Sequence, residues 1–245
     1  MATFVLVHGA FIGGWAWRRV VSLLRAAGHE VLTPTLTGIG ERSHLLGSQV
    51  GYGTHVDDIV NVLKYEGLED VILVGHSYAG LVITGVADRE PARIAKLVYL
   101  DSQIATSGQN AMGASPSGTA DKLGSLAESV GPRMLPPISL DAMGIFDPAD
   151  RAWVEPLVSP HPMKCLEDVV TLAHGDPRMP RSYIRCTDRA SMVAFFGIDP
   201  LATFVERAQK EGFQFHEIPS GHHPMITHPQ ELVSVLQAIA TSGTH

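Results

Sequence analysis

Short apolar runs alternate along much of the chain with longer segments in which apolar residues recur at helical spacing. Residues 71–74 form an apolar, β-branched run that is typical of a buried strand. Residues 15–27 show helical spacing and end at Gly28, which is a helix-stop signal. The same criteria predict strands at 4–7, 30–36, 71–74, 94–100, 182–186 and 213–218, and helices at 15–27, 54–65, 81–87, 200–211 and 229–240. Such alternation predicts a mostly parallel six-stranded sheet with helices on both faces.

The alternation stops between about residues 102 and 180. This stretch is rich in Gly, Pro, Ser and Met, with short helical patches near 120–130 and 165–173. A long irregular insertion in a compact domain is usually functional. We therefore expect one α/β domain over residues 1–245, in which residues 102–180 form a cap over the sheet.

A serine stands between a predicted buried strand and a predicted helix, in the sequence Gly75-His76-Ser77-Tyr78-Ala79-Gly80. A serine flanked by small residues at this place is typical of a nucleophile elbow. Gly75 meets the demand for a small residue fully, whereas Ala79 stands where glycine is usual. The alternative is an ordinary glycine-rich turn with an incidental serine.

A serine hydroxyl is a weak nucleophile and needs a base within hydrogen-bond reach. We predict His222 as this base, because it follows the last predicted strand and so lies at the same carboxyl edge as Ser77. His223 is its rival. The acid that orients the histidine is Asp101 or Asp188, since each ends a predicted strand after the serine and before the histidine.

Acyl transfer also needs hydrogen-bond donors for the oxyanion. The N–H of Ala10, just after the first strand, and the N–H of Tyr78, at the start of the elbow helix, are the predicted donors. The glycines of residues 9–14 and 38–40 lack the spacing of a dinucleotide or P-loop site. No cofactor is expected.

Composition narrows the class of protein. With 245 residues, 45% of them hydrophobic, the chain can bury one large core. A net charge of −7 argues against nucleic acid or an anionic membrane as partner. No apolar run is long enough for a membrane span, and the N-terminus lacks the basic lead of a secretion signal. Two cysteines are too few for a thiolate metal site. We expect a cytoplasmic enzyme without a metal, and the sequence carries no signal for an oligomeric state.

The elbow, the His8-Gly9-Ala10 segment and the loop around His222 together resemble the α/β-hydrolase superfamily. More closely, residues 5–10 with Gly13-Gly14-Trp15 resemble the branch of plant methylsalicylate-type esterases and hydroxynitrile lyases. The resemblance implies Ser77 as nucleophile, His222 as base, and Ala10 and Tyr78 as oxyanion donors. Residues 35–38 and 40–42 are also similar to bacterial esterases that cleave the carbamate of benzimidazole fungicides.

Two departures from this branch matter. Plant members place the acid two residues beyond a Cys-Thr pair, where this chain has Arg189. The end of the fourth strand, Tyr99-Leu100-Asp101, instead resembles haloalkane dehalogenases, some of which carry their acid there, and this favours Asp101 over Asp188. Lyases of the branch have threonine and lysine where this chain has Gly9 and His223, and their replacement favours hydrolysis.

The combined prediction is a serine hydrolase that acts through an acyl-enzyme on small apolar or aromatic esters, with carbamates or amides as further substrates. Lyase-type carbonyl chemistry and a non-catalytic small-ligand receptor are the alternatives. Five apolar residues are predicted to bind substrate, with core packing as the alternative role of each: Phe11, Ile12, Met143, Phe146 and Trp153.

Overall fold

A central parallel sheet organises the computed structural model, which describes residues 1–130 and 134–242. Its six strands lie in the order β2-β1-β3-β4-β7-β8, and every neighbouring pair is parallel. The strands are β1 (Thr3–Val7), β2 (Glu30–Leu32), β3 (Val71–His76), β4 (Ile94–Leu100), β7 (Arg181–Cys186) and β8 (Gln214–Ile218). The predicted six-stranded α/β architecture is confirmed.

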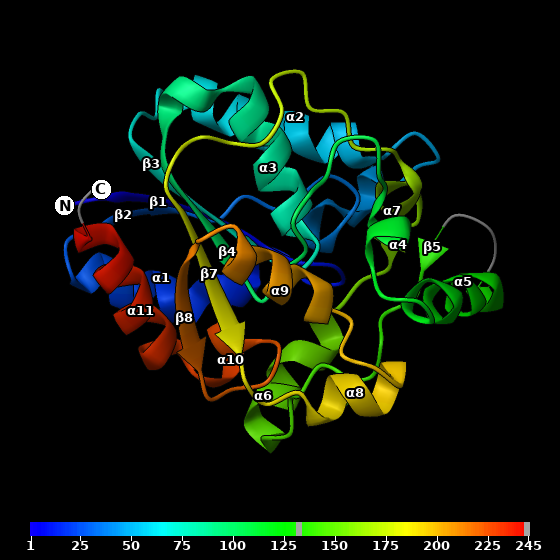
Figure 1. The fold of residues 1–245 in the computed structure, drawn as a ribbon. Coiled ribbons are helices and arrows are strands. Elements are labelled where there is room, and N and C mark those ends of the chain that lie inside the picture. The colour runs from blue at the N-terminus through cyan, green and yellow to red at the C-terminus, as the bar shows by residue number, and fades with distance from the viewer. Residues whose placement is uncertain (131–133, 243–245) are drawn as a thin grey trace.

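Helices cover both faces of this sheet (Figure 1). On one face α1 (Arg18–Ala26) packs against α11 (Pro229–Thr241), and on the other α2 (Tyr52–Tyr65) packs against α3 (Ala79–Arg89). The helix α9 (Ala202–Lys210) contacts β7. Four 3₁₀ helices are described: η1 (Gly14–Trp17), η2 (Gly40–Leu45), η3 (Pro91–Arg93) and η4 (Glu155–Leu157).

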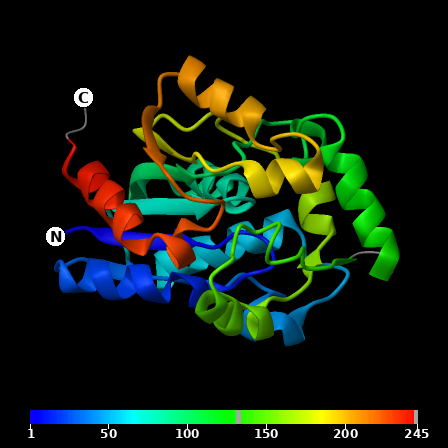
Figure 2. The same cartoon turned by 90° about the horizontal axis from the view of Figure 1, so that it is seen from below.

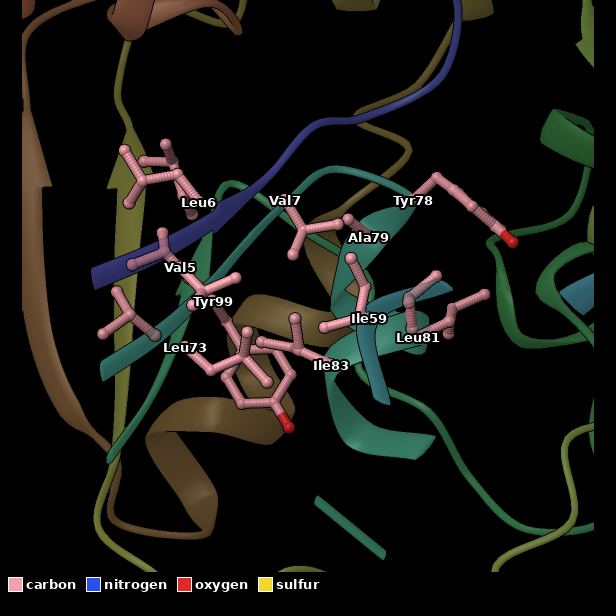
Figure 3. Packing of buried hydrophobic residues seen from close by; sticks show 14 of the residues in the cluster. Val5, Leu6, Val7, Ile59, Leu73, Tyr78, Ala79, Leu81, Ile83 and Tyr99 are labelled. Carbon is pink, nitrogen blue, oxygen red and sulfur yellow. The ribbon is translucent and has the colours of Figure 1, made fainter. Parts of the chain in front are cut away.

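The core lies on both sides of the middle strands. β3 is buried at every position, as expected of a parallel strand that has helices on both faces. In Figure 3, Val5 of β1, Leu73 of β3 and Tyr99 of β4 lie beside Ile83 of α3. The Tyr99 hydroxyl is paired with the Thr84 hydroxyl at 2.8 Å, so the polar end of this large core residue is satisfied.

The chain between β4 and β7 forms the cap, which we define as residues 102–180. It contains α4 (Ala111–Ala114), α5 (Thr119–Val130), β5 (Met134–Leu135), α6 (Pro148–Val154), β6 (His161–Pro162) and α7 (Lys164–Glu167). β5 and β6 pair in antiparallel fashion, and α7 contacts α2. Figures 1 and 2 show α5 beside α8 (Ala190–Phe196), at the opposite end of the molecule from the N-terminus.

Some element boundaries differ from those predicted. β2 ends at Leu32 rather than at residue 36, because it is an edge strand that runs into Pro34, which has no N–H for the ladder. The helical patch predicted at 165–173 is only the single turn of α7. Four α-helices were not predicted: α4, α6, α8 and the short α10 (Pro224–Thr227). In the described part of the chain, no helix is long and apolar enough to cross a membrane.

Candidate active site

The carboxyl ends of β3 and β4 and the loop after β8 bring three predicted residues together. Ser77 follows β3, Asp101 follows β4, and His222 lies beyond β8. The backbone N–H of Ser77 donates to the Leu100 carbonyl at 3.1 Å, and that of Asp101 donates to the Ile184 carbonyl at 2.7 Å. These bonds continue the sheet ladders past the strand ends, so the sheet fixes where both side chains start.

The elbow has the strained backbone that the sequence predicts. Ser77 has φ of 55°, in the left-handed region that non-glycine residues rarely adopt. A side chain at Gly75 would place its Cβ 2.6 Å from the Ala79 carbonyl oxygen, so position 75 requires glycine. The single methyl of Ala79 fits at the other side of the turn, where it is fully buried.

His222 lies between the serine and one of the two candidate acids. Its Nε2 is 2.9 Å from Ser77 Oγ, and its Nδ1 is 2.5 Å from Asp101 Oδ2. A carboxylate only accepts, so Nδ1 carries the proton and Nε2 is left to accept from the serine hydroxyl. This is the hydrogen-bond order of a Ser-His-Asp triad.

Asp101 is buried completely and is surrounded by donors. Its Oδ1 accepts the backbone N–H of Cys186 at 3.2 Å, and its Oδ2 accepts from Arg189 Nη1 at 2.6 Å as well as from His222. Burial by itself would raise the pKa of Asp101, but the hydrogen bond and charge of His222 and the charge of Arg189 outweigh it and lower that pKa. The carboxylate is therefore ionised.

The alternative acid, Asp188, has a different role. Its side chain is exposed, and its Oδ1 accepts the backbone N–H of Ala190 at 3.2 Å, just before α8 begins. Its own N–H donates to the Ser220 carbonyl at 3.0 Å, which continues the β7–β8 ladder. The structure brings Asp101 to His222 and turns Asp188 toward solvent.

The two predicted oxyanion donors flank Ser77. Gly9 passes so close to the elbow that a Cβ on it would lie 2.8 Å from Ser77 Cβ, which sets Ala10 beside the nucleophile. Tyr78 is the N-cap of α3, so its N–H lies at the positive end of the helix dipole. Within the described residues, neither the Ala10 N–H nor the Tyr78 N–H pairs with a backbone carbonyl.

Buried side chains brace both donor segments. His8 accepts the Leu36 N–H at Nε2 (3.0 Å) and donates from Nδ1 to the Gly9 carbonyl (2.8 Å). Burial is the largest cause that lowers the pKa of His8, to about 4, so the ring is neutral, as this bonding requires. The Tyr78 hydroxyl, whose pKa burial raises well above its usual value, donates to His55 Nδ1 at 3.1 Å. These bracing roles of His8 and His55 have no signal in the sequence.

The rival base His223 is occupied elsewhere. Its Nδ1 donates to the carbonyl of Met143 in the cap at 2.9 Å. Burial, followed by the charge of His222, lowers the pKa of His223 to about 3, so this ring is neutral. Close by, Gly144 of the cap (φ 75°) packs against Gly221, where a Cβ on Gly144 would lie 3.5 Å from the Gly221 Cα. The cap is thus attached to the loop that carries His222.

A mostly apolar cavity of about 100 Å³ opens beside Ser77. Of the five predicted substrate-binding residues it includes Phe11. The residues that line it come from the loop after β1, the elbow, the cap, α8, the loop before α9 and the loop after β8: Ala10, Phe11, Ser77, Tyr78, Gln103, Ser115, Thr119, Leu123, Leu135, Ile138, Leu166, Met192, Phe196, Pro200, Leu201, His222 and His223.

The other four predicted substrate-binding residues lie outside this cavity lining. Ile12 and Met143 are fully buried in the core, whereas Phe146 is 59% exposed. Trp153 packs edge-to-face on Trp15, with ring centroids 5.7 Å apart. The apolar faces of α5 and α8 line the cavity instead, which follows from how the cap packs and not from the hydrophobicity of single residues.

Metal coordination has no candidate within residues 1–130 and 134–242. In the described ranges, no three or more His, Cys, Asp or Glu side chains come together in a way that could hold a metal ion.

Comparison with known proteins identifies the family. A family model described as "Alpha/beta hydrolase family" matches residues 4–235. The carbendazim hydrolyzing esterase of Nocardioides sp. (strain SG-4G) is 37% identical over 249 residues, covering 98% of this chain and 100% of that protein. The putative chloroplastic methylesterase 11 of Arabidopsis thaliana is 33% identical over 110 residues, 44% of this chain and 28% of that protein.

Solved structures agree with this assignment. An extracellular alpha/beta-hydrolase from a Paenibacillus species superposes with a TM-score of 0.78 at 22% identity, covering 97% of this chain and 98% of that one, and so shares the fold. The full-length match to a curated esterase confirms the resemblance seen in the sequence motifs. This chain belongs to the α/β-hydrolase family.

Proposed function

We propose that this protein is a serine hydrolase that cleaves small apolar or aromatic carboxylic esters through an acyl-enzyme. The observation that carries the proposal is the continuous hydrogen-bond chain from Ser77 through His222 to Asp101, beside an apolar cavity. Membership of the α/β-hydrolase family and the 37% identity to an esterase along the whole chain support it.

In the proposed mechanism Ser77 Oγ attacks the substrate carbonyl while its proton passes to His222 Nε2. Asp101 stabilises the imidazolium that forms, and the N–H groups of Ala10 and Tyr78 bind the oxyanion. When the tetrahedral intermediate collapses, the alcohol leaves with the proton from His222. Water then attacks the acyl-enzyme with His222 again as base, which releases the acid and restores Ser77.

The proposed substrates follow from the cavity and the relatives. A small, mostly apolar volume suits a compact or aromatic acyl or alcohol group. Carbamates and amides undergo the same attack, and the esterase that matches along the whole chain is named for hydrolysing carbendazim. We propose no cofactor, and no nucleic acid or membrane partner. The two buried, unpaired cysteines, Cys165 and Cys186, fit the proposed cytoplasmic location.

Burst kinetics test this function. With p-nitrophenyl acetate or butyrate, we expect release of about one p-nitrophenol per active site before the steady state, and Ser77→Ala should abolish both phases. A phosphonate ester should label Ser77, as identified by peptide mass spectrometry. Label on another residue, or hydrolysis that survives in Ser77→Ala, would overturn the proposal.

A cyanohydrin assay separates hydrolysis from lyase chemistry. His223 follows the proposed base, is neutral and is bonded to Met143, so it offers no positive charge for a departing cyanide. We expect no cyanide release. An inactive protein that nevertheless binds small esters would favour the receptor alternative.

A further inference from the structure

Arg189 connects the buried acid of the proposed triad to a second carboxylate. Its Nη1 donates to Asp101 Oδ2 at 2.6 Å, and its Nη2 donates to Asp199 Oδ1 at 2.7 Å. Asp199 in turn accepts from Arg185 Nη2 through its other oxygen at 3.0 Å. Starting at Asp101, negative and positive groups thus alternate along one hydrogen-bonded chain of side chains.

The contact between Arg189 and Asp101 is buried. The Asp101 side chain is 0% exposed and that of Arg189 is 10% exposed, so water screens their interaction weakly. Burial acts to lower the pKa of Arg189, but the charges of Asp101 and Asp199 outweigh it and raise that pKa. The guanidinium is therefore charged at neutral and acidic pH.

Arg189 and His222 share one oxygen of Asp101. Both Arg189 Nη1 and His222 Nδ1 donate to Oδ2, while the Cys186 N–H donates to Oδ1. The carboxylate cannot rotate without breaking one of these bonds, so its orientation toward the imidazole is fixed. The charge of Arg189 offsets part of the negative charge on the oxygen that accepts from His222.

We propose that Arg189 is a positioning residue, which holds Asp101 toward His222 and offsets part of the negative charge that faces the imidazole. This inference rests on the proposed function, in which His222 is the base and Asp101 its partner. It adds a residue that touches neither the substrate nor the nucleophile.

The sign of the effect follows from the order of charges. Asp101 stabilises a protonated His222, and the positive Arg189 beyond it opposes that protonation. Removing the guanidinium should favour the protonated, inactive form of His222. Removing Asp199 should leave the charge of the guanidinium less neutralised, and this should disfavour protonation of His222. Neither substitution removes the other titratable groups that face His222 or Asp101, which are His76, His223, Tyr183 and Cys186.

The test is the acid limb of the pH–kcat/KM profile for ester cleavage. Arg189→Gln should move the midpoint of this acid limb up by about one pH unit, and it should lower the plateau of kcat/KM on the order of 10- to 100-fold. Arg189→Lys keeps a charge beside Asp101, so its midpoint should stay near that of the wild type. Its plateau should be reduced, because the single ammonium nitrogen of lysine cannot occupy both Nη positions of the arginine. Asp199→Asn should move the midpoint down.

Arg185→Gln is the matched control. Arg185 belongs to the same chain of charges because it donates to Asp199, but it does not contact Asp101. Its midpoint should stay near that of the wild type. If Arg189→Gln lowers the rate but leaves the midpoint unchanged, Arg189 is merely structural and the inference is wrong. If that variant does not fold, Asp199→Asn decides, and an unchanged or raised midpoint overturns the inference.

Titration of the His222 ring by NMR, assigned with a His222→Asn variant, gives the same midpoints without turnover. This measurement distinguishes a failure of the proposed function from a failure of the role of Arg189. Ester cleavage that persists in Ser77→Ala would remove the function, while opposite NMR shifts in Arg189→Gln and Asp199→Asn would still support the role of Arg189.

Discussion

His76 Nε2 donates a hydrogen bond of 2.7 Å to the backbone carbonyl of His222. The residue before Ser77 thus holds the loop that presents His222. Burial, followed by the charges of His222 and His223, places the pKa of His76 well below its usual value. A neutral ring that donates from Nε2 has a fixed tautomer. Because this bond holds the backbone of His222, we expect it to help set the distance between Ser77 and His222.

Replacing His76 should therefore affect turnover more than binding. His76→Leu fills similar volume but cannot donate, and we expect kcat to fall on the order of 10- to 100-fold with a smaller change in KM. His76→Gln can place an amide N–H near the former Nε2 and should recover part of the loss. Steady-state kinetics with a thermal melt of each variant provide the measurement. Equal losses in the two variants would contradict the role of the hydrogen bond.

The two aspartates should differ sharply in kinetics. Asp101→Asn removes the acceptor that fixes the tautomer of His222, and kcat should fall on the order of 10³- to 10⁴-fold. Asp188→Asn is the matched control, because Asp188 is exposed and its contact is with Ala190. Its kcat should stay within about twofold of wild type. A large loss in Asp188→Asn would mean that the acid has been misassigned.

Gly80 permits close packing between α3 and the chain after β4. A Cβ at Gly80 would lie 2.0 Å from the Gln103 carbonyl oxygen and 2.5 Å from Ser102 Oγ. We expect Gly80→Ala to lower the free energy of unfolding by about 1–3 kcal/mol or more. Gly53→Ala, in an exposed turn of α2 with no atom near the added methyl, should raise it by about 0.5–1 kcal/mol. Urea unfolding of both variants tests the contrast, and equal effects would argue against the close contact.

Buried neutral histidines should make the fold sensitive to acid. Burial lowers the pKa of His8 to about 4 and that of His223 to about 3, from 6.5 in the unfolded chain. The unfolded chain binds more protons in this range, so the stability from neutral histidines is complete above pH 6.5 and is lost as pH falls toward the folded-state values. Each such ring should contribute about 1.4 kcal/mol per pH unit to the slope of the free energy of unfolding against pH.

His223→Asn isolates one of these contributions. The asparagine amide can still donate to the Met143 carbonyl but does not titrate. Urea unfolding at several pH values between 6.5 and 4 should show a shallower loss of stability than in the wild type. A slope as steep as that of the wild type would show that His223 does not take part in the acid sensitivity.

The periodic parts of the chain could be predicted from sequence because their patterns are local. The run at 71–74 and the elbow around Ser77 needed only short-range information, and β3 and α3 lie where expected. The end of β2 was missed because the effect of Pro34 depends on the strand lying at the edge of the sheet.

The site was predictable to the extent that it lies at strand ends. Strand order alone could not choose between Asp101 and Asp188, because both follow strands at the same edge, and the resemblance favoured Asp101. The structure separates them through the orientation of the chain after β7, which turns Arg189 inward and Asp188 outward. The substrate-binding residues of the cap were predicted from their hydrophobicity. Hydrophobicity alone cannot distinguish a residue that lines the cavity from an exposed residue such as Phe146 or a core residue such as Met143.

The attachment of the cap to the base loop limits how a substrate can enter. Met143 accepts from His223, and Gly144 rests on Gly221, so residues 139–145 cannot lift away without displacing the imidazole beside them. Movement of this segment away from the sheet would shift His222 away from Ser77 at the same time as it exposed the cavity to water. A substrate that entered past α5 and α8, which also line the cavity, would leave the contacts of Met143 and Gly144 with the His222 loop intact.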